Sequence, residues 1–527
     1  MKTILGKTIY AFRAVRYAKA PVGQLRFKNA VPIESWNDIY DATQEGPACP
    51  TPTVKGEISE DCLRLNVYSN ELPTATKKVK KPVIVFIHPG AFYGYSGQSS
   101  SFGPHYYLDQ DIVLVTINYR LGVLGFMSTG DARAPGNLGL KDQVVALRWI
   151  QNHITKFGGD PNSVTVTGCS AGSWSTLFHL LSPVSKGLFH RAIAISGAPT
   201  VPEQLPYNQT HLITKQASFV GCPTDNVDKA IECLKTVPYK QLSDSLPRFA
   251  EWYGDPILVW SPVVEPKIPG VERFITDQPE NLLRKKQFQQ IPVIIGVTKD
   301  EFSSAPLSAL EQAMQGDDSI YRNVTENWYF AAPISFQYER GTERSKRISR
   351  EIYKFYFNDK PITVENGPNL GLIYADAQIG FLSHRFAQLL AEYSTAPIYE
   401  YQFAYQGRFS WAMWKSGPKK GQPYGVVHQD DLIYLFTMPG YGFPAFNSTD
   451  PEVKMIKKLT TMYANFAKTD EPIPKNNNLF KGVHWETLDP KKSNYLEIND
   501  NFTMKRKMFA DRYALWDRLF PLRPLPK

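Results

Sequence analysis

The sequence predicts an α/β fold, in which helices cover both faces of a mostly parallel central sheet. Three observations support this prediction. Short apolar runs recur along the 527 residues, and stretches with helical periodicity separate them. One of these runs also leads into a sharp turn around a serine and then into an apolar helix. Strands that alternate with helices favour a parallel sheet, because each parallel neighbour requires a crossover connection.

The expected strands are continuous apolar runs, which are typical of strands buried on both faces. Between two of them, Val144, Leu147 and Ile150 fall on one face of a helix. Residues 201–290 and 301–395 are richer in helix-like and irregular sequence, so we expect large helical insertions above the strand ends. The strands are expected at residues 83–87, 112–117, 164–167, 192–195, 291–295 and 398–403.

No linker, low-complexity run or internal repeat divides the chain, so we expect residues 1–527 to form a single domain. The net charge is +9, and its one dense run, at residues 77–81, is typical of a solvated loop. The sequence contains no nucleic-acid-binding motif and no stretch of 18 apolar residues. We therefore expect no nucleic-acid partner, no transmembrane segment and no metal site, whereas the oligomeric state stays open.

Residues 168–172 match the G-x-S-x-G pattern of a nucleophile elbow. The pattern alone is short, but here a β-branched strand precedes it and an apolar helical stretch follows it. Strand, tight turn and helix are the context that the pattern requires in the α/β-hydrolase fold. Such a turn exposes the serine hydroxyl at the positive end of a helix, so Ser170 is the predicted nucleophile.

A serine hydroxyl needs a base to take its proton and a third group to orient that base. In α/β-hydrolases the chain order is Ser, then Asp or Glu, then His. His428 lies in a loop-like stretch after the last clear core strand, and it is the candidate base. Asp300 and Glu301 directly follow the strand near residue 295, where this fold carries its acid. Spacing alone does not separate these two carboxylates.

The cysteines and the glycosylation sequons bear on the cellular compartment. Two cysteine pairs are close in sequence and one cysteine is left over: Cys49 and Cys62, Cys222 and Cys233, and Cys169. Bridged pairs indicate an oxidising compartment, whereas five free thiols would fit a cytoplasmic enzyme. Four Asn-x-Ser/Thr sequons favour the secretory route, at Asn208, Asn323, Asn447 and Asn501. We therefore expect an extracellular protein, with a cytoplasmic one as the alternative.

Several longer motifs follow one another along the chain. They include EDCLRLNVY at 60–68, NYRLG at 118–122, GNLGLKDQ at 136–143 and FGGDP at 157–161. With these motifs the chain resembles the type-B carboxylesterase/cholinesterase family, and insect carboxylesterases in particular, over nearly its whole length. The resemblance implies an α/β-hydrolase that hydrolyses small carboxylic esters without a cofactor. Members of this kind are usually secreted and glycosylated.

The resemblance also implies roles for individual residues. Glu301 rather than Asp300 corresponds to the family's acid, and His428 corresponds to its base. The pairs Cys49–Cys62 and Cys222–Cys233 correspond to disulfides that are common in the family. The oxyanion of the reaction is expected to bind three backbone N–H groups: Ala171, which follows the nucleophile, and Gly90 and Ala91 after the strand at 83–87.

Several positions depart from the family pattern. Cys169 replaces a Glu, or the Gln of juvenile-hormone esterases, so we expect weaker handling of cationic substrates and altered reactivation after organophosphate attack. Pro89 replaces the first glycine of the oxyanion stretch; it has no N–H but is not an expected donor. Phe302 replaces a small residue and is either a pocket wall or core packing. The signal peptide and opening strand of the family are missing, so we expect a truncated N-terminus.

The predicted function is that of a general carboxylesterase for xenobiotic or lipid esters, acting through an acyl-enzyme with Ser170, His428 and Glu301. One alternative is a catalytically inactive, cholinesterase-like adhesion protein, although such proteins typically lose the Ser or the His. A second alternative is a dedicated juvenile-hormone or pheromone esterase. Candidates for the pocket walls are Trp252, Trp260 and Phe302, for which core packing is at least as strong an interpretation.

Overall fold

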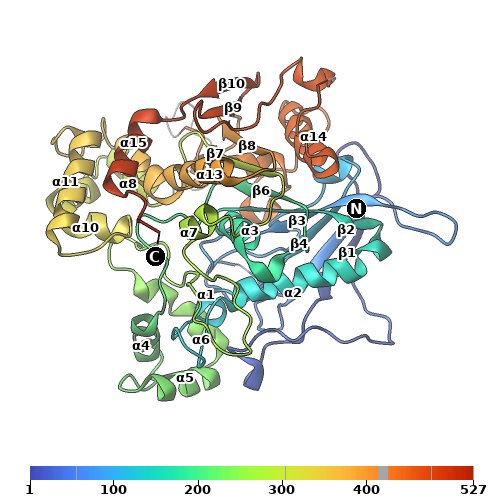
Figure 1. Ribbon diagram of the computed structural model, residues 1–527, viewed down its shortest axis with the longest axis horizontal. Helices are drawn as coiled ribbons and strands as arrows, with labels where there is room; N and C mark the ends of the chain where they lie inside the picture. Colours follow the sequence, from blue (N-terminus) through green and yellow to red (C-terminus); the bar gives the residue numbers. More distant parts are fainter. Residues whose placement is uncertain (55, 303, 414–424, 476, 526–527) are drawn as a thin grey trace.

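A ten-stranded sheet runs through the part of the chain that the structure describes (Figure 1). The structure is a computed structural model, and it describes residues 1–54, 56–302, 304–413, 425–475 and 477–525. The strands are β1 (Tyr10–Arg16), β2 (Arg64–Ser69), β3 (Lys81–Ile87), β4 (Val113–Ile117), β5 (Gly159–Cys169), β6 (Arg191–Ile195), β7 (Val293–Thr298), β8 (Ile398–Phe403), β9 (Asn494–Ile498) and β10 (Thr503–Arg506).

The sheet has the strand order β1-β2-β4-β3-β5-β6-β7-β8-β9-β10. The strands from β4 to β9 in this order pair in parallel, and β1, β2 and β10 add antiparallel edges. Because the central strands are parallel, their carboxyl ends share one edge. Ligand sites in open α/β sheets lie at that edge.

Both faces of the sheet are buried, as the continuous apolar strands predict. Along β3, Val83, Val85 and Ile87 belong to one apolar core, whereas Ile84 and Phe86 belong to a second core. All five side chains are fully buried. The predicted arrangement of a mostly parallel sheet between two layers of helices is therefore confirmed (Figure 1).

Most helices either lie between strands or belong to the two predicted insertions. Those between strands are α1 (Gly122–Phe126), α2 (Leu138–His153), α3 (Ala171–Leu181) and α14 (Val453–Thr469), and α15 (Ala510–Leu519) follows β10. Those of the insertions are α4 (Thr210–Phe219), α5 (Val227–Thr236), α6 (Tyr239–Asp244), α7 (Pro279–Arg284), α8 (Ser304–Met314), α9 (Ser319–Glu326), α10 (Trp328–Ser335), α11 (Glu343–Phe357), α12 (Pro368–Ala375) and α13 (Phe381–Tyr393). A π-helical turn, Asp376–Gly380, joins α12 to α13.

All six expected strands are present, as β3 to β8, and four further strands were not predicted. β1 has the sequence YAFRAVR and β10 the sequence TMKR, so neither has a continuous apolar run. Both lie at the edges of the sheet, where one side of the strand has no partner and solvent replaces part of the core. An apolar-run criterion therefore finds central strands and misses edge strands.

Candidate active site

Ser170 occupies the turn between β5 and α3. Its backbone has φ 57° and ψ −119°, a conformation that a non-glycine residue rarely adopts. The Ser170 N–H donates to the carbonyl oxygen of Ile195 at 2.9 Å, and the N–H of Trp174 donates to the Ser170 carbonyl at 2.9 Å. The neighbouring strand and the first helical turn therefore hold the strained residue in place.

The two glycines of the pattern are required by close backbone contacts. A Cβ atom at Gly172 would lie 2.0 Å from the carbonyl oxygen of Ile87 in β3. A Cβ atom at Gly168 would lie 2.3 Å from the carbonyl oxygen of Gly172. Both clashes are with backbone atoms, which cannot move aside by a change of rotamer as a side chain can. The G-x-S-x-G spacing is thus the consequence of packing a helix directly against two strand ends.

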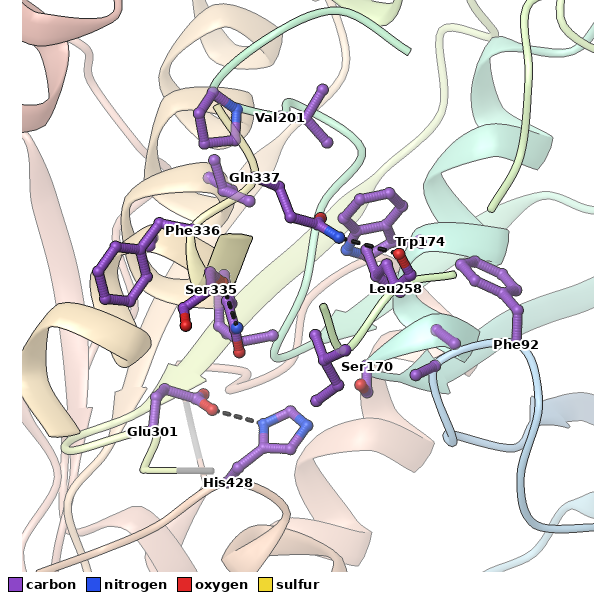
Figure 2. A pocket seen from close by; sticks show the side chains of 18 residues that line it. Phe92, Ser170, Trp174, Val201, Leu258, Glu301, Ser335, Phe336, Gln337 and His428 are labelled. Atoms are coloured by element: carbon purple, nitrogen blue, oxygen red, sulfur yellow. Dashed lines mark hydrogen bonds and ion pairs between the residues drawn. The ribbon is translucent and has the colours of Figure 1, made fainter. Parts of the chain in front are cut away.

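His428 and Glu301 form a hydrogen-bonded pair beside Ser170. His428 Nδ1 lies 2.6 Å from Glu301 Oε2, which leaves Nε2 for the nucleophile side (Figure 2). In this view the imidazole lies between Glu301 and Ser170, and all three residues line one cavity. No hydrogen bond joins Ser170 to His428 within the described residues; in ligand-free enzymes such catalytic contacts are often long and tighten with substrate.

Glu301 is held by groups that the sequence did not single out. The Ser196 hydroxyl donates to Glu301 Oε1 at 2.5 Å, and the Thr298 N–H donates to the same oxygen at 2.6 Å. The Glu301 side chain is 3% exposed. One carboxylate oxygen is thus fixed by the ends of β6 and β7 while the other faces the imidazole. The position of Ser196 after β6 is the only sequence signal that could have found it.

Asp300 points elsewhere, so the structure separates the two carboxylates that spacing left equivalent. Asp300 Oδ2 accepts the N–H of Val426 at 2.7 Å, and the Asp300 N–H donates to the Val426 carbonyl at 3.0 Å. These bonds tie the loop before His428 to the end of β7. Glu301 is the carboxylate in contact with the imidazole, and Asp300 fastens the loop that carries it.

Three backbone N–H groups lie around the cavities at Ser170. Those of Gly90, Ala91 and Ala171 donate to no group within the described residues, and Ala91 and Ala171 line the same cavity as Ser170. Gly90 has φ 116°, and a Cβ atom there would lie 2.4 Å from the Gly94 carbonyl oxygen. Only glycine fits this turn.

His88 sits at the start of this loop and has a structural role. Its ring stacks on Tyr119 at 4.5 Å, and its Nδ1 lies 2.8 Å from the carbonyl oxygen of Pro89. Burial lowers the pKa of His88 to about 4. A neutral, buried imidazole of this kind supports the loop and takes no part in proton transfer at neutral pH.

Cys169 lies immediately before the nucleophile but on the other face of β5. Its side chain is fully buried in the second core, away from the cavities. Burial, and then the negative charges of Asp431 and Glu301, raise the pKa of the Cys169 thiol well above its ordinary value. The thiol is therefore neutral and inaccessible to a substrate.

Two cavities meet at Ser170 and His428. The smaller has a volume of about 700 Å³, and the larger about 1290 Å³. Phe302 lines the larger cavity and also packs in the core, so both interpretations of this residue hold. Trp260 is fully buried in the core and borders a different pocket, so core packing is the one of its two expected roles that the structure supports. Trp252 lines neither cavity at Ser170.

The structure contains two disulfides, Cys49–Cys62 and Cys222–Cys233, and Cys169 is a free thiol. Three of the four sequon asparagines are exposed, and Asn323 is half-buried on α9. None of the helices in the described ranges has the length and apolarity needed to cross a membrane. Within the same ranges, no group of three His, Cys, Asp or Glu side chains is placed to hold a metal ion.

Comparison with known proteins places this geometry in a family. The model of the carboxylesterase family matches residues 1–516. This chain belongs to the carboxylesterase family. Esterase E4 of Myzus persicae is 37% identical over 499 residues, which cover 93% of this chain and 87% of that one. A juvenile hormone esterase of Tribolium castaneum is 33% identical, covering 98% of this chain and 91% of the relative.

A solved carboxylesterase-family structure has the same fold. The juvenile hormone esterase of Manduca sexta, crystallised with covalently attached OTFP, superposes with a TM-score of 0.84. It is 29% identical in sequence, and the match covers 98% of this chain and 96% of that one. The predicted family and the predicted α/β-hydrolase fold are both confirmed.

Proposed function

We propose that this carboxylesterase hydrolyses small carboxylic esters through an acyl-enzyme on Ser170, with His428 as base and Glu301 as its orienting acid. The observation that supports the proposal is the 2.6 Å contact between His428 Nδ1 and Glu301 Oε2 next to a strained elbow serine. A carboxylate on Nδ1 fixes the tautomer that leaves Nε2 free to accept a proton, and it stabilises the imidazolium that forms.

In the first half-reaction, Ser170 Oγ attacks the ester carbonyl carbon while His428 Nε2 takes the hydroxyl proton. The carbonyl π electrons move to oxygen, which is bound by the N–H groups of Gly90, Ala91 and Ala171. The intermediate collapses, the C–O bond to the alcohol breaks, and His428 returns its proton to the leaving alkoxide. Water then repeats the sequence on the acyl-enzyme and releases the carboxylic acid.

The two cavities indicate the kind of ester that fits. The smaller cavity is lined largely by apolar side chains, including Phe92, Trp174 and Leu382; among the described residues that line it, Glu301 is the one acidic side chain and none is Lys or Arg. An uncharged apolar group therefore suits it. Cys169 adds no negative charge beside Ser170, which supports the expectation of weak activity on cationic esters.

A general carboxylesterase for xenobiotic or lipid esters is favoured over the two alternatives. An inactive adhesion protein does not need an elbow serine, a paired histidine and, at the two cavities that meet at Ser170, three N–H groups without partners among the described residues. A dedicated juvenile hormone esterase is the second candidate, because relatives of that name cover almost the whole chain. Cys169 in place of the Gln of those esterases argues against it.

We also propose that the protein is secreted and glycosylated, in keeping with two disulfides and three exposed sequon asparagines. Mass spectrometry without reductant is expected to find both cysteine pairs bridged and Cys169 free. Enzymatic deglycosylation of protein made in insect cells is expected to lower its mass. Alkylation of all five cysteines in unreduced protein would contradict the proposal.

The catalytic proposal is tested with p-nitrophenyl esters and a fluorophosphonate probe. The purified protein is expected to hydrolyse short-chain esters and to be labelled on Ser170. Ser170→Ala is expected to lose labelling and to lower kcat by about 10³-fold or more, with an unchanged melting temperature. Activity of Ser170→Ala close to that of the unsubstituted protein would refute the assignment of the nucleophile.

A further inference from the structure

One wall of the smaller cavity is a π-helical turn. α12 ends at Ala375, the π-turn spans Asp376–Gly380, and α13 begins at Phe381. The N–H of Phe381 donates to the carbonyl of Asp376, five residues earlier rather than four. Single π-turns within α-helices are rare and occur frequently at functional sites.

Three consecutive residues of this turn face the substrate cavity: Ala377, Gln378 and Ile379. An α-helix completes a turn in 3.6 residues, so three consecutive side chains spread around most of its circumference. A turn closed five residues apart contains more residues, and its consecutive side chains lie closer in direction. The π-turn therefore presents a wider surface to the cavity than a regular helix would.

The residue that opens the turn, Asp376, is not among the residues that line the cavity, and it is held from two other helices. Its carboxylate is fully buried and forms a bidentate pair with Arg512 of α15, with Arg512 Nε 2.7 Å from Oδ2. The Tyr356 hydroxyl of α11 donates to the same carboxylate. Trp516 Nε1 donates to the Tyr356 hydroxyl at 3.0 Å.

The other end of the turn also contacts α15. A Cβ atom at Gly380 would lie 2.7 Å from the Tyr513 hydroxyl, so the Tyr513 side chain of α15 packs against the backbone of the turn. α15 and α11 lie beside each other at one end of the molecule (Figure 1). Both ends of the π-turn are thus fastened to helices that do not themselves line the cavity.

A buried carboxylate is strongly unfavourable without a charged partner, so the position of Asp376 depends on the position of Arg512. We infer that the Asp376–Arg512 pair fixes the π-turn and thereby sets the size of the apolar substrate group that the smaller cavity accepts. Asp376 and Arg512 are positioning residues, since neither is placed to touch substrate. The inference rests on the proposed esterase function and adds a determinant of its specificity.

The test compares Arg512→Met, Arg512→Lys and Asp376→Asn with a matched control, Arg518→Met. Arg518 lies on the same helix and pairs with Glu351 at 3.4 Å, on an exposed surface away from the turn. Two ester series are assayed for kcat/KM: p-nitrophenyl esters from acetate to laurate, and acetates of alcohols of increasing length. The rate of fluorophosphonate labelling of Ser170 reports on the catalytic machinery separately.

Arg512→Met is expected to change the ratio of long-chain to short-chain kcat/KM in one series by about fivefold or more, because pocket selection by one methylene already reaches this size. The rate at which the fluorophosphonate labels Ser170 is expected to stay within about threefold of that of the unsubstituted protein, because Ser170, His428 and Glu301 are unchanged. Arg512→Lys keeps the charge and is expected to restore part of the profile, and Arg518→Met to change nothing.

An active protein whose variants keep the same chain-length profile in both series, whether or not their overall rates fall, would overturn the inference. If Arg512→Met does not fold, Arg512→Lys and Asp376→Asn carry the same comparison. Failure of the proposed function has a different signature: the unsubstituted protein would neither hydrolyse any ester nor react with the fluorophosphonate, and the inference would fall with it.

Discussion

The strand ends that carry Ser170 and the helical insertions that enclose it are held in place by different kinds of bond. At the strand ends, backbone groups do most of the positioning: the Ser170 N–H donates to Ile195 and the Thr298 N–H donates to Glu301, with the Ser196 hydroxyl as an added side-chain contact. In the insertions, contacts between side chains hold the helices in place. Asp376 pairs with Arg512, and the Tyr374 hydroxyl donates to the Asp255 carboxylate.

Because of this difference, the positions of the reacting groups are fixed, whereas the shape of the cavity walls can be altered. Backbone positions follow from the sheet and change only if the sheet changes, so the reacting groups keep their geometry. A side-chain contact can be altered by one substitution, so the cavity walls can vary while the reacting groups do not. We therefore expect substitutions at the strand ends to affect the rate for every ester and those in the insertions to affect the choice of ester.

The largest expected effect separates two neighbouring carboxylates at the end of β7. Glu301→Gln keeps the shape of the side chain but removes the charge that orients His428, and kcat is expected to fall by about 10³-fold or more. Asp300→Asn retains an acceptor for the Val426 N–H, so the expected loss is about threefold. Steady-state kinetics on one p-nitrophenyl ester measures both. Equal losses would mean that the loop, rather than the acid, limits the rate.

A second comparison adds one methyl group in each region. Gly172→Ala places a Cβ atom 2.0 Å from the backbone oxygen of Ile87, and it is expected to destabilise the fold by about 3 kcal/mol or more. Gly371→Ala places a Cβ atom 2.9 Å from the ring of Phe302, which can rotate. It is expected to keep the fold and to raise KM for bulky esters. Denaturant unfolding and KM measurements distinguish the two; equal stability of the variants would contradict the comparison.

The same difference explains how much of the site could be predicted from sequence. Ser170 and its two glycines form a local pattern because the close backbone contacts that require them lie within the elbow, at Gly168, or between the elbow and β3, at Gly172. His428 and Glu301 could be found only with chain order and family resemblance, because they are 127 positions apart in sequence and no spacing rule links them. The fold class followed from central strands whose two faces are buried.

What could not be predicted depends on contacts between distant side chains. Asp376 and Arg512 are 136 residues apart, and neither has a local pattern that marks it. Ser196 and Glu301 are 105 residues apart. Trp260 was a plausible wall residue because it is large and apolar, but the same properties put it in the core. Composition indicates that an aromatic side chain is buried, not which cavity it borders.

A smaller effect is expected from the hydrogen bond between Ser196 and Glu301. Ser196→Ala removes the hydroxyl that donates to Glu301 Oε1, while the Thr298 N–H remains. A loss of about tenfold in kcat with an unchanged KM is expected, because a hydrogen bond to a charged group contributes about 1.5 kcal/mol. Ser185→Ala is the control: Ser185 is buried and hydrogen-bonded to His179, away from the site. A tenfold loss in both variants would point to a general packing effect.

The last comparison concerns the pH dependence of stability at Asp431. Burial, and then the negative charge of Glu301, raise the pKa of Asp431 to about 7. Its Oδ2 accepts a hydrogen bond from Tyr401 at 3.1 Å, whereas Oδ1 is buried without a partner within the described residues. In the unfolded chain the pKa of an aspartate is about 3.9. Between about pH 4 and pH 7, therefore, Asp431 is protonated in the folded protein and ionised in the unfolded chain.

Because the folded state binds more protons in that window, the free energy of unfolding falls as the pH rises from about 4 to about 7, by up to about 1.4 kcal/mol per pH unit. Asp431→Asn keeps an acceptor for Tyr401 but cannot titrate, so its denaturation midpoint is expected to fall less over this range. Asp38→Asn, at an exposed position, is expected to behave like the unsubstituted protein. If the denaturation midpoints of all three proteins change with pH in the same way, Asp431 is ionised throughout this range. The folded protein would then tolerate the charges of Asp431 and Glu301 side by side.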